Sequence, residues 1–195
     1  AHRASLMLPS AWHTPRLSVR DATAADLGLC HACLAESQDA APLDPAFKLV
    51  PPAEIQEHIT RSTGEAALPS RAFQMQVLRL TSSEDAVGYW HFMAVPKRPE
   101  AIGVSIMLIR PAYRRQGLGR ELVEGALARF EPSKTELWAR VYLGNPRAIE
   151  FWAGLGLARL VRLHDTYVST PAEQPSIILS RCLPDRDGSC RDRNA

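Results

Sequence analysis

The chain has 195 residues, a length that suits one domain with a hydrophobic core. Apolar residues make up 46% and charged residues 23%, as in ordinary globular proteins, and the formal net charge is only +2. This charge is too small to favour nucleic acid or an anionic membrane as a partner, and no apolar run is long enough to span a bilayer. We therefore expect a cytoplasmic globular protein.

The first part of the chain predicts one strand and two helices. Residues 16–20 alternate apolar and charged side chains, as a strand does. Thr23 is a suitable N-cap for a helix over residues 24–36, and a pair of prolines starts a second helix over 52–61. The segment over 38–52 is rich in Pro, Asp and Ala and is expected to be a loop.

The middle of the chain has strand periodicity. Residues 73–80 alternate, residues 86–95 are rich in aromatic and β-branched side chains, and residues 101–109 are almost continuously apolar. Polar turns over 81–84 and 96–100 separate the three segments. The simplest arrangement is an antiparallel meander.

The last part returns to helical spacing. Residues 118–130 carry an apolar stripe at helical spacing. Asn145 and the proline after it predict a second helix start, and Gly156 is placed to end that helix in a left-handed conformation. Three further segments have strand character: 136–143, 157–168 and 176–183. We expect one α/β domain over 15–183, an irregular lead-in over 1–14 and a polar tail over 184–195.

The loop between the buried strand and the following helix reads Arg114-Arg115-Gln116-Gly117-Leu118-Gly119. Glycines allow a ligand close to the backbone, and the free N–H groups of a helix start favour an anion. Arg120 adds further positive charge. A Walker A loop needs a G-K-[ST] ending, and the dinucleotide fingerprint needs glycine where this chain has Leu122. Two interpretations stay open: a pyrophosphate cradle, or a basic helix start without a ligand.

Two segments resemble signatures of the GNAT acetyltransferase superfamily. Arg114, Gly117 and Gly119 lie on the fixed positions of its motif [QR]-x-x-G-x-[GA]. The second signature is N-x-x-A-[IL]-x-[LF]-Y-x-x-x-G-[FL], and it is matched at Asn145, Ala148, Ile149, Phe151, Gly156 and Leu157. The resemblance covers about residues 15–183, and the two motifs lie on the expected elements.

The resemblance implies a central mixed, mostly antiparallel sheet of about seven strands flanked by about four helices. It implies a V-shaped splay between the fourth and fifth strands, 101–109 and 136–143. It also implies acetyl-CoA as acyl donor, with an oxyanion donor at an amide near Ile109 and direct attack by a primary amine in a ternary complex. The residues expected to bind acetyl-CoA are Leu108, Ile109, Arg114, Arg115, Gln116, Gly117, Leu118, Gly119, Arg120, Asn145 and Trp152.

Two proton-transfer groups of the family are replaced. Trp152 stands where many relatives have a tyrosine acid, and Gly103 where some have a glutamate base. Indole N–H is a donor but not a usable acid. We consider His91 as the base and Tyr142 as the donor to the thiolate, although a lone histidine on a strand is also a common structural residue. A CoA-binding regulatory module without catalysis is the alternative function.

Further predictions concern the acceptor and the cysteines. The acceptor is a small-molecule or protein amine, the loop over 38–52 is expected to shape its pocket, and the chain could form a homodimer. Asp39 and Asp44 could attract a cation there or simply be solvated. Cys30 and Cys33 form C-x-x-C without a second ligand pair, so we expect buried free thiols and no metal site.

Overall fold

The computed structural model describes residues 7–45, 47–63, 73–164 and 175–183. The strands form one eight-stranded sheet in the order β1-β2-β3-β4-β5-β6-β8-β7, in which only β5 and β6 pair in parallel. The strands are β1 (Ala11–His13), β2 (Leu17–Asp21), β3 (Phe73–Leu80), β4 (Ala86–Val95), β5 (Arg98–Ile109), β6 (Glu136–Tyr142), β7 (Arg159–His164) and β8 (Ser176–Cys182). The α-helices are α1 (Leu27–Glu36), α2 (Pro52–Thr63), α3 (Leu118–Leu127) and α4 (Pro146–Ala153).

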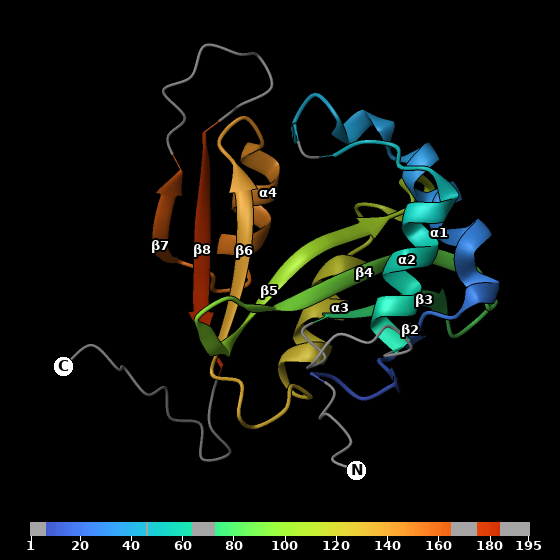
Figure 1. Cartoon of the computed structure of the whole chain (residues 1–195), viewed down its shortest axis with the longest axis horizontal. Coiled ribbons are helices and arrows are strands. Elements are labelled where there is room, and N and C mark those ends of the chain that lie inside the picture. Colours follow the sequence, from blue (N-terminus) through green and yellow to red (C-terminus); the bar gives the residue numbers. More distant parts are fainter. Residues whose placement is uncertain (1–6, 46, 64–72, 165–174, 184–195) are drawn as a thin grey trace.

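The helices cover both faces of the sheet (Figure 1). Successive side chains of a strand point to opposite faces, and β4 shows this clearly. Tyr89 belongs to the core cluster beneath α1 and α2, whereas its neighbour Trp90 belongs to the cluster beneath α3 and α4. The mixed, mostly antiparallel sheet implied by the resemblance is confirmed.

Several boundaries differ from the sequence prediction: α1 begins at Leu27 after a 3₁₀ turn over Ala24–Asp26, and α3 ends at Leu127. The lead-in over 1–14 is not wholly irregular, because Ala11–His13 forms edge strand β1, where the Trp12 indole donates a hydrogen bond to Gln76 Oε1 at 3.1 Å. The turn expected over 96–100 is shorter, because Lys97 takes a φ of +63° and the strand resumes at Arg98. The tail over 184–195 lies outside the described residues.

Helix α4 begins and ends as predicted. Asn145 Oδ1 accepts a hydrogen bond from the amide of Ala148 at 3.1 Å. Gly156 has a φ of +85°, and the Leu157 amide donates to the Trp152 carbonyl at 3.0 Å. This bond and the positive φ are those of a Schellman cap, which favours glycine.

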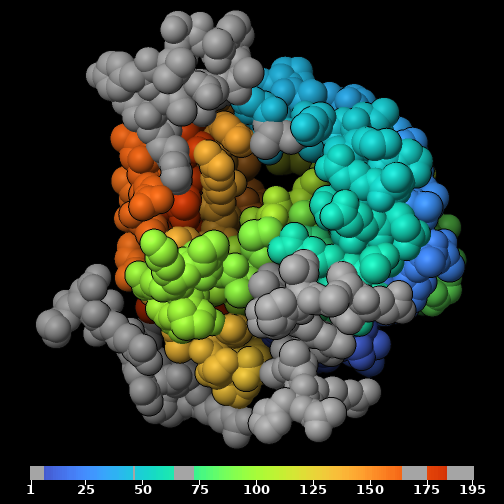
Figure 2. All heavy atoms as spheres, viewed as in Figure 1, coloured from blue at the N-terminus to red at the C-terminus, as the bar shows by residue number. Residues whose placement is uncertain are grey.

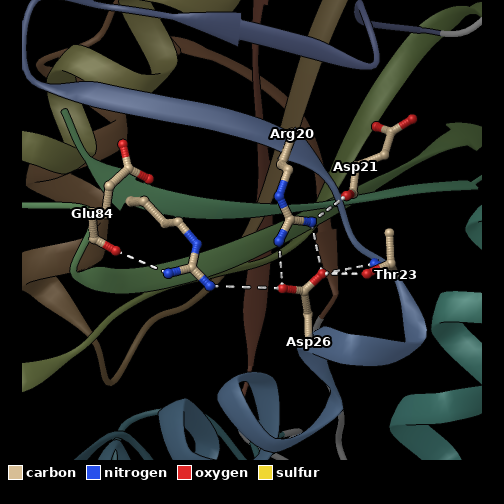
Figure 3. A network of polar contacts seen from close by, with 6 residues as sticks. Arg20, Asp21, Thr23, Asp26 and Glu84 are labelled. Carbon is tan, nitrogen blue, oxygen red and sulfur yellow. Dashed lines mark hydrogen bonds and ion pairs between the residues drawn. The ribbon is translucent and has the colours of Figure 1, made fainter.

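A buried carboxylate joins β2 to the start of α1 (Figure 3). Asp26 accepts two hydrogen bonds of 2.7 Å from Arg20 and one of 2.9 Å from the amide of Thr23. Arg79 lies 4.0 Å from the same carboxylate and donates to the Glu84 carbonyl. Burial raises the pKa of Asp26, but the hydrogen bonds from Arg20 and Thr23 outweigh it, so the net pKa is lowered.

The two cysteines of the C-x-x-C pair are free and buried, as predicted. Burial raises the pKa of Cys30 to about 12 and that of Cys33 to about 11, so both stay protonated near neutral pH. Within the described residues, no three or more His, Cys, Asp and Glu side chains gather as a metal site would require. None of the helices found there is long and apolar enough to cross a membrane.

Candidate active site

The sheet opens between β5 and β6. Their parallel pairing runs from Ala101 opposite Glu136 to Val104 opposite Ala139 and then ends. Beyond that point β5 stays paired with β4, and β6 stays paired with β8 as far as Tyr142 (Figure 1). The splay implied by the resemblance is therefore present, and it leaves one side of the last residues of β5 without a strand partner.

A β-bulge lies where the two strands part. The pairing of β4 with β5 shifts register between His91 and Phe92, and Ser105 has no residue opposite it. A bulge inserts one residue and breaks the alternation of faces. Ser105 therefore lines a pocket on the α1–α2 side, while Met107 packs with the core beneath α3. Alternation along a regular strand would put Ser105 and Met107 on the same side, and the bulge is the reason that they lie on different sides.

The end of β5 presents a backbone amide to the splay. Arg110 donates its amide to the Val87 carbonyl at 2.8 Å, which makes Gly88 and Ile109 a non-hydrogen-bonded pair. The N–H of Ile109 therefore points away from β4, towards the side that β6 has left. Any Cβ at Gly88 would collide with the Leu108 carbonyl, so glycine is needed for this close approach.

The start of α3 forms a natural anion site. Gly117 is its N-cap, with a φ of +81° and no capping side chain, and Arg115 also has a positive φ of 62°. The amide of Glu121 donates to the Gly117 carbonyl at 3.0 Å, so three amides come before this helical bond. They belong to Leu118, Gly119 and Arg120. Free amides, a helix dipole and left-handed residues are together the features with which a protein backbone can hold an anion such as phosphate.

The arginines of this loop differ in what their side chains do. Arg114 donates to the Ile109 carbonyl at 2.7 Å, to Asp39 at 2.6 Å and to Ser37 at 2.8 Å. It thus braces the loop against the end of α1, and Asp39 is its ion-pair partner. Arg120 donates to the Gly154 carbonyl at 3.0 Å and so joins α3 to α4.

Other side chains complete this loop. Arg115 is exposed beside the free amides, so its charge can face a bound anion. The Gln116 side chain donates to the Ala112 carbonyl at 3.1 Å. Leu118 is buried in the core. Gly119 faces Met107, since a Cβ there would lie 3.6 Å from the Met107 side chain.

Arg16 is a site residue that the sequence analysis missed. It reaches the loop from the β1–β2 connection, donates to the Gln116 carbonyl at 2.9 Å and pairs with Glu121 at 2.6 Å. A Cβ on Gly117 would lie 3.4 Å from its guanidinium. No local pattern signals this contact, because the partners are 100 residues apart.

Asn145 and Trp152 have structural roles. The side-chain oxygen of Asn145 caps α4. Trp152 is only 7% exposed and packs edge-on against Phe151, with ring centroids 5.0 Å apart. Phe151 is the residue of α4 that faces the α3 start, since a Cβ on Gly119 would lie 3.5 Å from its ring. Trp152, which the resemblance implied to bind acetyl-CoA, therefore serves the core.

A pocket of about 190 Å³ lies between the α1–α2 layer and strands β3 to β5. Its apolar lining is Leu34, Phe47, Val50, Ile55, Met75 and Ile106. Its polar lining is Lys48, Glu54, His58, Tyr89, His91 and Ser105. The loop over 38–52 thus contributes to the pocket, as expected. Figure 2 shows the surface hollowed above β5, between β6 and the blue and cyan segments of the α1–α2 layer.

His91 lies in the wall of this pocket, and Tyr142 lies on the other arm of the splay. Burial lowers the pKa of His91 to about 3, helped by the positive charges of His58 and Arg61, so its imidazole is neutral and a weak base. Its Nδ1 is buried without a hydrogen-bond partner in the described chain. Tyr142 does not line the pocket, and the guanidinium of Arg140 lies 5.6 Å from its ring.

Known proteins match the chain by family and by fold. The model of the acetyltransferase (GNAT) family matches residues 48–157. No curated protein sequence matches the chain. An acetyltransferase structure from Thermus thermophilus is 23% identical with a TM-score of 0.66, over 88% of this chain and 100% of that one.

Two further solved structures share the fold. The spermidine N-acetyltransferase of Vibrio cholerae, in complex with CoA and spermine, is 14% identical with a TM-score of 0.66, over 87% of this chain and 97% of its own. A Salmonella typhimurium acetyl transferase that modifies the N-terminal serine of ribosomal protein L7/L12 is 9% identical with a TM-score of 0.70, over 87% of this chain and 96% of its own. Identities this low establish a common fold, not a common substrate.

Proposed function

Because the chain belongs to the GNAT acetyltransferase family, whose members take the acetyl group from acetyl-CoA, we propose that it acetylates a primary amine by direct attack in a ternary complex. The observation that carries this proposal is the uncapped start of α3 beside the splay of β5 and β6. An anion site and a slot with a free strand edge are what an extended, phosphate-bearing thioester requires.

The residues present fit acetyl-CoA in three places. The pyrophosphate would meet the amides from Gln116 to Arg120, with Arg115 facing it. The pantetheine arm would lie along Leu108 and Ile109, whose outer edge is not covered by β6. The amide of Ile109 points into the slot and is placed to stabilise negative charge on the thioester oxygen.

Acetyl transfer forms a C–N bond and breaks a C–S bond, and a proton of the amine must finally reach the thiol. Burial and neighbouring positive charges keep His91 neutral but weaken it as a base, so we assign deprotonation of the amine to water. Tyr142 is the candidate donor to the thiolate, since it lies on the arm of the splay opposite Ile109.

Two measurements test the proposal. Acetyl-CoA at millimolar concentration should raise the melting temperature of the protein, because ligand binding to the native state stabilises it. A mixed pool of primary amines should then increase the release of free CoA thiol above the amine-free rate. Stabilisation without amine-dependent release would indicate a CoA-binding regulatory module, and an unmoved melting temperature would refute the cofactor site itself.

A further inference from the structure

The pocket beneath α1 and α2 holds a buried polar atom without a partner. His91 is 8% exposed, and its Nδ1 has no hydrogen bond within the described chain. A buried polar group that is left unpaired destabilises a protein, so the fold keeps this imidazole in the pocket wall against its own stability. A neutral imidazole has one nitrogen that donates a hydrogen bond and one that accepts, and Nδ1 itself is closed off from the pocket.

The size of the pocket limits what it can hold. Its volume is about 190 Å³. Pockets for drug-sized ligands are larger, about 300–1,000 Å³. An apolar cavity of about 150 Å³ is known to bind benzene. The space described here therefore suits one aromatic ring or branched alkyl group with a short arm.

The lining disfavours a polycation. Among the described residues of the wall, Glu54 is the one carboxylate, and Lys48 offsets its charge. A polyamine needs several acidic partners along its length, because each desolvated ammonium group requires one. Half of the twelve lining residues are apolar, which favours an apolar body instead.

The pocket also extends towards the place of reaction, because its lining residue Tyr89 pairs with Leu108, the neighbour of Ile109. His91 pairs with Ile106, next to the bulge at Ser105, and both Ser105 and His91 line the pocket. The bulge lies at the point where β5 separates from β6. An amine bound at His91 with its body under α1 and α2 would therefore enter from the side opposite α3.

We propose that this pocket selects a compact apolar primary amine, such as an arylalkylamine, whose nitrogen hydrogen-bonds to the exposed part of the His91 imidazole. The proposal rests on the transferase function above and adds the class of its acceptor. His91 is then a positioning residue for the neutral amine and not the base that removes its proton.

An acceptor panel tests the class. With saturating acetyl-CoA, CoA release is measured for 2-phenylethylamine, isopentylamine, spermidine and a serine-initiated tetrapeptide. We expect kcat/KM for the two apolar amines to be at least about tenfold above the other two, the size of effect that one buried ring provides. Faster turnover of spermidine or of the peptide would overturn this inference and leave the transferase function intact. No release with any amine, despite acetyl-CoA binding, would overturn both.

Substitution of His91 tests whether this residue positions the amine. His91→Phe should raise KM for 2-phenylethylamine about tenfold, leave the Kd of acetyl-CoA unchanged and raise the melting temperature of the ligand-free protein, since it removes the unpaired nitrogen. His31→Phe, on α1 outside the pocket lining, should change none of these. An unchanged KM in His91→Phe would contradict the proposal.

A second pair of substitutions tests the pocket without changing His91. Val50→Trp adds volume at the pocket wall and should raise KM for 2-phenylethylamine strongly, again without a change in the Kd of acetyl-CoA. Its neighbour Leu49 is 46% exposed and does not line the pocket, so Leu49→Trp is the matched control. Equal KM values in the two variants would refute the pocket as the acceptor site.

Discussion

Replacement of Arg115 by glycine should stabilise the protein and weaken acetyl-CoA binding at the same time. Arg115 has a φ of +62°, in the left-handed region that costs a non-glycine residue about 1–2 kcal/mol. Glycine removes this strain but loses about 0.5–1 kcal/mol of backbone entropy on folding. The net gain is therefore about 0–1.5 kcal/mol, or a rise of up to about 6 °C in melting temperature for a chain of this length.

The effect on binding has the opposite sign. Arg115 is exposed next to the free amides at the start of α3. A charge pair near a protein surface is worth about 1–4 kcal/mol at 4 Å, and solvent screening places an exposed arginine near the low end. We expect the Kd of acetyl-CoA in Arg115→Gly to rise about five- to tenfold at low salt. The difference should shrink at 0.5 M salt, where charges are screened over a few ångströms.

A matched control separates strain from charge. Lys97 has a φ of +63° in the turn between β4 and β5, away from the loop. Lys97→Gly should stabilise the protein by a similar amount and leave the Kd of acetyl-CoA unchanged in calorimetric titrations. If Arg115→Gly binds acetyl-CoA as tightly as Lys97→Gly at low salt, Arg115 does not face the pyrophosphate and the reasoning fails.

Further predictions concern stability and chemistry. The pKa values of Asp26 and Glu121 are lowered in the folded protein from ordinary values of 3.8 and 4.5, because hydrogen bonds and ion pairs outweigh burial. Their stabilisation is complete above those ordinary values and is lost as the pH falls through the lowered ones, so the urea midpoint should drop between pH 6 and pH 3. Asp26→Asn should reduce that drop, and an equal drop would contradict the prediction. Trp152→Ala should lower the free energy of unfolding by about 3–5 kcal/mol in urea titrations, and a loss below about 1 kcal/mol would argue against its core role. Tyr142→Phe should lower kcat about 10²–10⁴-fold in CoA-release assays with the Kd of acetyl-CoA unchanged, whereas an unaltered kcat would remove Tyr142 from the mechanism.

The sequence by itself determined the elements whose cause is local. Asn145 caps α4 and Gly156 ends it with a positive φ, because capping depends on residues a few positions apart. The glycine at 117 and the apolar stripe after it predicted the uncapped helix start for the same reason. Two short motifs, on elements of the expected type and order, indicated the family whose model then matched residues 48–157.

Only the tertiary structure decided which side chains are available at the site. Arg114 matches the motif, but its guanidinium is bound to Ser37 and Asp39 of a distant segment. Arg16 is not part of the motif, and yet its side chain lies against Gly117. Such contacts depend on how segments far apart in the chain meet, and no local spacing records that.

The acceptor pocket illustrates the same limit. The period of two of a regular strand would give Ser105 and Met107 a common face, but a bulge opposite His91 places them on different faces of the sheet. A bulge arises from the register between two strands, and one strand alone does not determine it. The neutral, unpaired state of His91 likewise follows from burial by α2 and β3, which the sequence around His91 does not encode.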